Sequence, residues 1–220
     1  MSLWIEAAGE SLALQPDGSV WWPRGRTLFA ADLHLGKGAA FRAQGQPMPA
    51  GSSARTLARL SEGVFQHGAQ RLVVLGDFWH GAQGITPQLV EAVAAFGARV
   101  PTVLVLGNHD RRIHPAGLPL QVAERPLSLG ALTAAHEPPP PGSEGFTLAG
   151  HWHPAVSLAS RAGDRLRRPC FVRFAHALVL PAYGGLTGAL TLHRGELARQ
   201  GADVAVLGEG SVHWLPCLRS

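Results

Sequence analysis

Five short groups of polar residues in the sequence combine side chains that bind divalent metal ions. In chain order they are Asp32-Leu33-His34, Gly76-Asp77, Gly107-Asn108-His109-Asp110, His136 and Gly150-His151-Trp152-His153. Carboxylate oxygens, imidazole nitrogens and amide oxygens suit Mn²⁺, Zn²⁺ or iron. The absence of cysteines near these groups argues against a structural thiolate site. The groups therefore predict a metal centre.

The five groups differ in how specific they are. A chain with 11 histidines can contain an Asp-x-His or a His-x-His by chance, and an aspartate after a glycine, such as Asp77, often only caps a helix. Asn108 is the only asparagine of the protein, which makes its group more specific. His136 taken alone would more often be a structural histidine. The ordered set of groups is the strong signal.

The charge of such a centre indicates what it binds. Two divalent ions bring four positive charges, of which Asp32, Asp77 and a bridging hydroxide offset three. The remaining positive charge suits an anionic phosphoester, and it suits the additional negative charge of the transition state.

Apolar runs that precede these groups explain how they could meet. Strands are expected at Leu28 to Ala31, Leu72 to Leu75, Val103 to Leu106, Leu132 to Ala135 and Phe146 to Ala149, each directly before one group. Because the carboxyl ends of strands in an open α/β sheet share one edge, where ligands bind, the five groups are expected to converge there.

Helical stretches separate the first three of these strands. One helix is expected to begin with Ser52 or Ser53 as its cap, and another at Thr86-Pro87, with Leu89, Val90, Val93 and Phe96 on its buried face. The resulting β-α-β-α-β order predicts a largely parallel sheet buried on both faces.

The two ends of the chain follow a different pattern. Ser11 to Leu14 and Val20 to Trp22 flank Pro16-Asp17-Gly18, which predicts a hairpin. After about residue 128, closely spaced strands without good helices predict a second, mixed or antiparallel sheet packed on the first; besides those named above, the candidates are Phe171 to Leu180, Leu190 to Leu192 and Val204 to Leu207.

Composition adds broad limits. With 220 residues, 46% hydrophobic and 15% charged, the chain is expected to form one globular domain. All but one of its 19 basic residues are arginines, which favours an anionic partner or reflects only a genome rich in arginine codons. Two isolated cysteines, the absence of a signal-peptide pattern and the absence of a long apolar run favour a cytoplasmic protein without membrane contact.

The motifs resemble those of the calcineurin-like metallophosphoesterases, and within them those of the bacterial ligase-associated DNA damage response endonucleases of the PdeM type. Besides the five groups, the resemblance rests on Leu35-Gly36-Lys37, Phe41-Arg42, Pro47 to Gly51, Glu137-Pro138, Pro154, Pro169-Cys170-Phe171, Leu180 to Gly184 and Thr187-Gly188. It covers nearly the whole chain. It implies an α/β fold of two packed mixed β-sheets flanked by helices, the four-layer metallophosphoesterase sandwich, with residues 1–220 as a single domain and no separate capping domain.

The resemblance also implies a division of the metal ligands. One ion is expected to be held by Asp32, His34, Asp77 and His153, and the other by Asp77, Asn108, His136 and His151. The expected ions are Mn²⁺ first, with Zn²⁺ or iron as alternatives. His109 is expected to protonate the leaving oxygen or to stabilise the pentacoordinate phosphorus, and Asp110 or His80 to orient it.

Differences between these motifs and those of other superfamily members disfavour some classes of substrate. Many phosphoprotein phosphatases of the superfamily have Asp-Arg-Gly in the second group and an arginine before Gly-Asn-His, where this chain has His80-Gly81 and Leu106. Because its second group ends in a histidine, His80, the chain resembles the SbcD-like nucleases, whose second motif also ends in histidine. Lipid A precursor pyrophosphatases typically have arginine at the place of His109, which disfavours that activity as well.

The function expected from these features is a dinuclear phosphodiesterase acting as a DNA endonuclease or nuclease in DNA repair, with a metal-bridging hydroxide attacking phosphorus in line. Backbone phosphates are expected to bind Lys37, Arg42, Arg111 and Arg112. Trp79 and Trp152 could stack on bases, although tryptophans inside metal motifs more often wall the site. The arginines from Arg161 to Arg168 could form only a solvated loop.

Several alternatives remain open at this point. A small-molecule phosphodiesterase acting on cyclic nucleotides fits the same metal centre. A non-catalytic scaffold of the same fold is less consistent, because every ligand position and His109 are filled. Without a capping region, the site is expected to be open and to depend on a partner or a homodimer for substrate choice; a DNA ligase or a helicase is the expected partner beside DNA.

Overall fold

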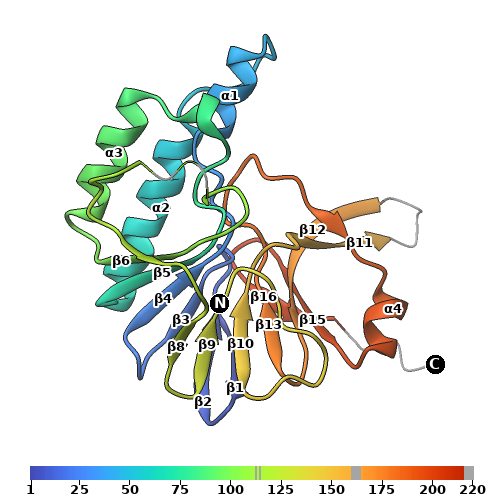
Figure 1. Cartoon of the computed structure of the whole chain (residues 1–220). Helices are drawn as coiled ribbons and strands as arrows, with labels where there is room; N and C mark the ends of the chain where they lie inside the picture. The colour runs from blue at the N-terminus through green and yellow to red at the C-terminus, as the bar shows by residue number, and fades with distance from the viewer. Residues whose placement is uncertain (112, 114, 160–164, 216–220) are drawn as a thin grey trace.

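The first of two β-sheets in the computed structural model has seven strands and carries the first three polar groups (Figure 1). The structure describes residues 1–111, 113, 115–159 and 165–215. In sheet order the strands are β1 (Leu3–Ala7), β2 (Glu10–Leu14), β3 (Val20–Trp22), β4 (Thr27–Ala30), β5 (Arg71–Leu75), β6 (Thr102–Val105) and β7 (Gln121–Ala123). The pairs from β1 to β4 are antiparallel and those from β4 to β7 are parallel.

The parallel strands β4 and β5 are buried because their residues are mostly apolar. All four residues of β4 are buried, as are Leu72 to Leu75 of β5. Unbroken apolar runs of this kind need cover on both faces of the sheet, which a layer of helices and a second sheet provide. The three strands that the sequence predicts in this part of the chain are confirmed within one residue at each end.

The hairpin near the amino terminus is also confirmed. The backbone N–H of Gln15 donates to the carbonyl of Ser19 at 2.9 Å, and the Asp17 carboxylate accepts from the backbone N–H of Ser19 at 2.9 Å. An aspartate that bonds its own backbone two residues on stabilises a tight turn. The sequence did not predict β1, which pairs with β2 along its whole length.

Helices α2 (Ser52–His67) and α3 (Pro87–Gly97) cover one face of this sheet. Helix α1 (Lys37–Ala43) packs against the 3₁₀ turn η1 (Ala82–Gly84), which lies between α2 and α3 in the chain. Thr86 caps α3 as expected, accepting from the backbone N–H of Leu89 at 3.2 Å. The expected serine cap of α2 is wrong. Gly51 precedes the helix in a left-handed conformation without a side-chain cap, because the Ser53 hydroxyl accepts instead from the backbone N–H of Gly36 at 2.9 Å.

The second sheet has nine strands, both parallel and antiparallel. They are β8 (Leu127–Leu129), β9 (Leu132–Ala134), β10 (Phe146–Ala149), β11 (Pro154–Ala159), β12 (Arg165–Arg173), β13 (Ala177–Val179), β14 (Leu190–Thr191), β15 (Asp203–Leu207) and β16 (Val212–Trp214). The single strand expected over Phe171 to Leu180 is wrong, because the chain bends between β12 and β13 and the two strands pair antiparallel. A fourth helix, α4 (Arg194–Arg199), was not predicted.

Three clusters of buried apolar side chains lie between the layers. The largest lies between the sheets and includes Phe29, Val73 and Phe171. A second joins the outer face of the first sheet to α2 and α3, and a third joins the second sheet to Leu197 of α4. Figure 1 shows α1 to α3 on one side of the molecule and α4 on the opposite side. The expected fold of two packed mixed sheets flanked by helices is confirmed.

Among the described helices, none combines the length and the apolar character needed to cross a membrane.

Candidate metal centre

The polar groups meet because the chain stays paired beyond the ends of β4 and β5. The backbone N–H of Asp32 donates to the carbonyl of Gly76 at 3.2 Å, and that of His34 donates to the carbonyl of Asp77 at 2.9 Å. Further on, Leu35 and Trp79 form a parallel bridge. These bonds place Asp32 and His34 beside Asp77.

Four of the predicted ligands form a first cluster: Asp32, His34, Asp77 and His153. The Nε2 atoms of His34 and His153 lie 3.3 Å apart. His34 Nε2 lies 3.8 Å from Asp77 Oδ2, and His153 Nε2 lies 3.5 Å from Asp32 Oδ1. Asp32, His34 and Asp77 are buried and His153 is half-buried, so this cluster forms the floor of the site.

A second cluster shares Asp77 with the first and adds His136 and His151. His136 Nε2 lies 3.0 Å from His151 Nδ1 and 3.5 Å from Asp77 Oδ1. The two carboxylate oxygens of Asp77 therefore face different clusters. Asn108 lies on the neighbouring loop with an exposed side chain, directly before His109, whose backbone N–H donates to Asp77 Oδ1 at 3.0 Å.

The spacing of the donor atoms fits metal ions. Ligand atoms at roughly 2.0–2.2 Å from one ion lie about 3–3.5 Å from each other, and most of the separations in the two clusters fall in this range. Each pair of facing imidazole nitrogens would need a proton on one member to form a hydrogen bond. With an ion between them, both lone pairs have a partner. The donor set is therefore suited to two ions that share Asp77.

Backbone carbonyls orient two of the imidazoles. His136 Nδ1 lies 3.0 Å from the carbonyl oxygen of Leu75, and His153 Nδ1 lies 3.0 Å from that of Gly188. A ring that donates its Nδ1–H to a carbonyl presents an unprotonated Nε2, the arrangement typical of metal-bound histidines. These carbonyls were not identifiable from the sequence, because any residue type can supply one.

Burial adjusts the charge states in the site. It lowers the pKa of His34 to about 2, with His153, His109, His80 and Lys37 adding to the effect, so this imidazole stays neutral. Burial also lowers the pKa of His153, but the hydrogen bond and the charge of Asp32 outweigh it and raise the pKa. Burial raises the pKa of Asp32 itself. A carboxylate in such a position is costly to ionise unless a cation lies beside it.

Backbone strain concentrates at the same residues. Among the described residues other than glycine, seven have a positive φ, and five of these are predicted ligands: Asp32, His34, Asp77, His151 and His153. Left-handed conformations of such residues cost about 1–3 kcal/mol each and persist where other interactions hold them. Bound metal ions would supply such interactions.

Removal of metal is therefore expected to destabilise the protein measurably. At a free metal concentration about 100-fold above the dissociation constant, binding to the folded state adds roughly 2.7 kcal/mol. For a domain of this size, the midpoint of thermal unfolding should rise by roughly 5–10 °C on adding Mn²⁺ to chelator-treated protein. Differential scanning calorimetry measures the shift. Identical midpoints with and without metal would contradict a folded-state metal site.

Two glycines leave room for the ligands. A Cβ at Gly76, whose φ is +79°, would overlap the His136 ring, and a Cβ at Gly107 would overlap the backbone nitrogen and the carboxylate of Asp77. Both positions therefore need glycine.

The variant Gly107→Ala should displace Asp77 and weaken metal affinity by about 10–100-fold, the range seen when groups that support a ligand are lost. Isothermal titration with Mn²⁺ measures the change. Gly195→Ala provides the control, since a Cβ at Gly195 meets no described atom within 4 Å. Equal affinity in both variants would show that Gly107 is not needed for the site.

His109 lies against His34 of the first cluster and contacts His80. Its Nδ1 lies 2.6 Å from the backbone carbonyl oxygen of His80, and the two rings stack with centroids 5.7 Å apart. His109 is exposed, and its ring meets that of His34 edge-on at 5.0 Å. Of the two candidates for orienting His109, the hydrogen bond comes from His80, through its backbone. Burial, aided by Lys37 and His109, lowers the pKa of the His80 side chain.

The carboxylate of Asp110 connects two loops of the site. Asp110 is fully buried, and its carboxylate accepts the backbone N–H groups of Phe78, Trp79 and Gly107 at 3.2, 3.0 and 3.0 Å. These bonds tie the loop after β6 to the loop after β5. Burial raises the pKa of Asp110, although the three hydrogen bonds oppose the shift. Asp110 is thus a positioning residue for the two loops that carry Asp77 and Asn108.

The four predicted phosphate-binding residues differ in their position and contacts. Burial lowers the pKa of Lys37, whose Nζ lies 5.5 Å from the centre of the Phe41 ring beside the His34 and His80 end of the site. Arg42 is exposed, but one of its Nη atoms donates to the carbonyls of Met48 and Pro49, both at 3.2 Å. Arg111 is exposed, and Arg112 lies outside the described residues.

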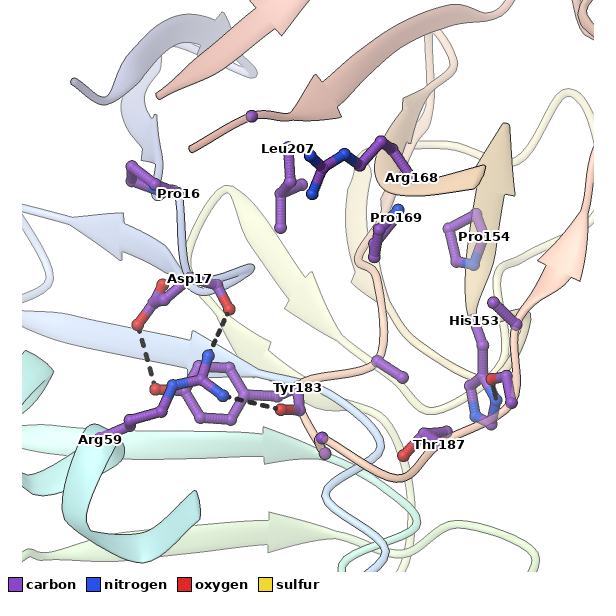
Figure 2. Close-up of a pocket in the computed structure, with 16 residues that line it drawn as sticks. Pro16, Asp17, Arg59, His153, Pro154, Arg168, Pro169, Tyr183, Thr187 and Leu207 are labelled. Atoms are coloured by element: carbon purple, nitrogen blue, oxygen red, sulfur yellow. Dashed lines mark hydrogen bonds between the residues drawn. The ribbon is translucent and has the colours of Figure 1, made fainter. Parts of the chain in front are cut away.

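A cavity of about 330 Å³ adjoins the site at His153 (Figure 2). On its far wall the Tyr183 hydroxyl donates to Asp17 at 3.0 Å, and Arg59 lies over the Tyr183 ring at 4.3 Å. The backbone N–H of Tyr183 donates to the carbonyl of Ala31 at 2.8 Å. Sequence reasoning gave Asp17 only a turn and Arg59 no function, because neither lies near a polar group along the chain. Together they fix Tyr183, which begins the segment that reaches Gly188 beside His153.

Comparisons with known proteins agree with this geometry. The family model described as calcineurin-like phosphoesterase matches residues 25–152. The crystal structure of the Pseudomonas putida nuclease MPE is similar, with a TM-score of 0.80 and 32% identity over 98% of this chain and 100% of that one. The E. coli phosphoesterase YfcE matches at 19% identity over 83% of this chain and 88% of that one, with a TM-score of 0.39. No curated protein matches.

Proposed function

Because this chain belongs to the calcineurin-like phosphoesterase family and is a metal-dependent phosphoesterase, we propose that it is a dinuclear phosphodiesterase that cleaves DNA. The observation that carries the proposal is the pair of ligand clusters sharing Asp77. The P. putida relative is a nuclease, which supports a nucleic-acid substrate. The motifs that resemble ligase-associated DNA damage response endonucleases support a function in DNA repair.

The residues divide the chemistry between them. Two bound ions, which we propose to be Mn²⁺, would supply an activated water nucleophile and neutralise charge on the phosphate. Asp77, whose two oxygens face different clusters, would be a ligand of both ions. The Asp32 carboxylate accepts the backbone N–H of His151 at 2.9 and 3.1 Å. Asp32 belongs only to the first cluster, so it would offset the positive charge of one ion and not of the other. The resulting net positive charge favours an anionic diester.

His109 is the residue suited to assist the leaving oxygen. The carbonyl of His80 holds Nδ1, so Nε2 is the atom free to face the substrate. A protonated Nε2–H can donate a proton to the departing alkoxide, as a positioned general acid does. Lys37 lies at the same end of the site, where its charge contributes to the lowered pKa of His34, and it is the side chain we propose to contact a phosphate oxygen.

A metal-by-substrate activity screen tests the proposal. Chelator-treated protein would receive Mn²⁺, Zn²⁺ or Fe²⁺ and be assayed on single-stranded DNA, duplex DNA, cyclic nucleotides and bis(p-nitrophenyl) phosphate. Cleavage of DNA with Mn²⁺ is expected. Turnover of cyclic nucleotides alone would favour the small-molecule alternative, which remains consistent with the metal centre. Inactivity on every diester would favour the scaffold.

Salt dependence provides a second, independent test. If lysine and arginine side chains hold backbone phosphates, affinity for an oligonucleotide should fall steeply with salt, with a slope of about −0.7 per contacted phosphate for single strands. Affinity that does not change with salt would contradict binding through the phosphates.

A further inference from the structure

Three arginines lie on a pair of strands that extends from the second sheet. A solvated loop is one expectation for the arginines from Arg161 to Arg168, but Arg165, Arg167 and Arg168 belong to β12. Arg161 lies outside the described residues. The first half of β12 pairs antiparallel with β11, and Figure 1 shows this pair extending away from the rest of the sheet. We call residues 154–159 and 165–169 the basic ribbon.

Hydrogen bonds connect the basic ribbon to the metal centre. β11 begins directly after His153, whose backbone carbonyl accepts the N–H of Leu190 at 3.0 Å. The carbonyl oxygen of Gly188 lies 3.0 Å from His153 Nδ1. Between these two residues, the carbonyl of Ala189 accepts a hydrogen bond from an Nη of Arg167. The guanidinium of Arg167 therefore lies beside the segment that contacts a predicted metal ligand on both its backbone and its ring.

Arg165 and Arg167 lie on the same face of the basic ribbon. Side chains alternate between the faces of a strand, so residues two apart share a face and lie about 7 Å apart. To reach Ala189, the Arg167 side chain crosses β11, because β12 and the segment before β14 lie on opposite sides of β11. Arg168 is on the other face of β12, where one of its Nη atoms lies 3.8 Å from the Glu209 carboxylate.

The positive charge of this face has no acidic counterpart in the strands around it. None of the residues of β11, β12 and β14 is an aspartate or a glutamate. Arg165 and Arg167 are both exposed. A guanidinium has five N–H donors, so Arg167 keeps donors for a ligand beside its bond to Ala189. Because arginine pairs with phosphate oxygens through two parallel hydrogen bonds, this face suits a row of phosphates.

The length of the basic ribbon sets how much of a nucleic-acid strand it can contact. The ribbon ends where Ala159 pairs with Arg165, and Ala159 is six residues beyond His153. Six residues of extended strand correspond to about 20 Å. Phosphates follow each other at about 3.4 Å along the axis of a stacked strand, so the ribbon spans about six of them.

We propose that the face of the basic ribbon with Arg165 and Arg167 binds the phosphates of the substrate strand on one side of the bond cleaved at the metal centre. The inference rests on the proposed function, since it assumes a nucleic-acid substrate. Phosphate contacts position a strand without reading its sequence. The ribbon therefore gives the enzyme a preference for long strands over dinucleotides and small diesters, and no preference for particular bases.

Strand length and salt concentration provide the test. For oligothymidylates of about two to twelve nucleotides with Mn²⁺, kcat/KM per diester bond should rise until the strand has roughly six nucleotides beyond the cleaved bond and then level off. On the longest strand, Arg165→Gln/Arg167→Gln should reduce the steepness of log kcat/KM against log salt by about 1.4, or about 0.7 per lost contact. A fourfold rise in salt should then lower kcat/KM of the wild type about sevenfold more than that of the variant.

Three further variants separate charge from structure. Arg165→Gln alone leaves the bond between Arg167 and Ala189 in place and should reduce the steepness by about 0.7. Arg165→Lys/Arg167→Lys keeps both charges and should keep the salt dependence of the wild type. Arg99→Gln removes an exposed arginine just after α3, which Figure 1 shows on the opposite side of the molecule from the ribbon, and should keep the dependence on salt and length.

The outcomes separate the two proposals. The same dependence on salt and length in the wild type, in Arg165→Gln and in the double glutamine variant would overturn the function of the ribbon and leave the nuclease function standing. Equal losses of kcat/KM on oligothymidylates and on bis(p-nitrophenyl) phosphate, at unchanged salt dependence, would also overturn it, because the variants would then act on the metal centre. Hydrolysis of bis(p-nitrophenyl) phosphate without cleavage of any oligonucleotide would overturn the nucleic-acid function and the function of the ribbon with it.

Discussion

Replacing Asp77 with asparagine is expected to lower phosphodiester hydrolysis by about 10³-fold or more, because metal-ion catalysis contributes several kcal/mol and each 1.4 kcal/mol is about a factor of ten. The two oxygens of Asp77 face different clusters, His34 on one side and His136 on the other. Asparagine keeps the shape but removes the charge and one oxygen. Both predicted ions then lose a shared ligand, so activity and metal content should fall together.

Initial rates on bis(p-nitrophenyl) phosphate and metal analysis of the purified protein measure both effects. Asp203→Asn is the matched control, since Asp203 is exposed at the start of β15, outside both clusters. Full activity of Asp77→Asn would refute the shared-ligand arrangement. Full metal content with lost activity would restrict Asp77 to a catalytic function other than metal binding.

The variant His109→Ala is expected to lower kcat by about 10²–10⁴-fold on diesters with poor leaving groups such as DNA. The ring is held by the His80 carbonyl and lies against His34, and the group that His109 forms with His34 and His80 contains no carboxylate, unlike the two clusters that share Asp77. Its loss should therefore leave metal content near that of the wild type. The effect should be smaller on p-nitrophenyl esters, whose leaving group departs without a proton.

Comparing the two leaving groups in the same variant isolates proton donation. His213→Ala serves as the control, because His213 is exposed on β16 and contacts Ser211. An equal loss on DNA and on the p-nitrophenyl ester would argue for stabilisation of the phosphorus centre rather than proton donation. Loss of metal in His109→Ala would instead give this residue a structural function.

The strand-end position of the polar groups could be predicted because burial requires it. A run such as Leu72 to Leu75 must lie in a covered sheet, and the charged residue after it must leave that sheet at an edge. The structure brings together the six predicted ligands that are aspartates or histidines in two clusters with Asp77 in common. Their binding of metal stays a prediction until it is measured.

Other features depended on contacts between distant segments. The α1 helix begins after Gly36 with no acidic residue or side-chain cap at its start, so it gave no local signal. The cap of α2 was misassigned because Ser53 bonds Gly36, seventeen positions away. Likewise, Trp79 and Trp152 have similar surroundings in the sequence, and only their burial distinguishes the core residue from the one that lines a cavity.

The most direct test of the central claim is a crystal structure of the Mn²⁺-loaded protein with anomalous diffraction at the manganese edge. Two anomalous peaks about 3.5–4 Å apart are expected. One should lie among Asp32, His34, Asp77 and His153, and the other among Asp77, Asn108, His136 and His151. A single peak at full occupancy, or peaks that do not share Asp77, would contradict a dinuclear centre.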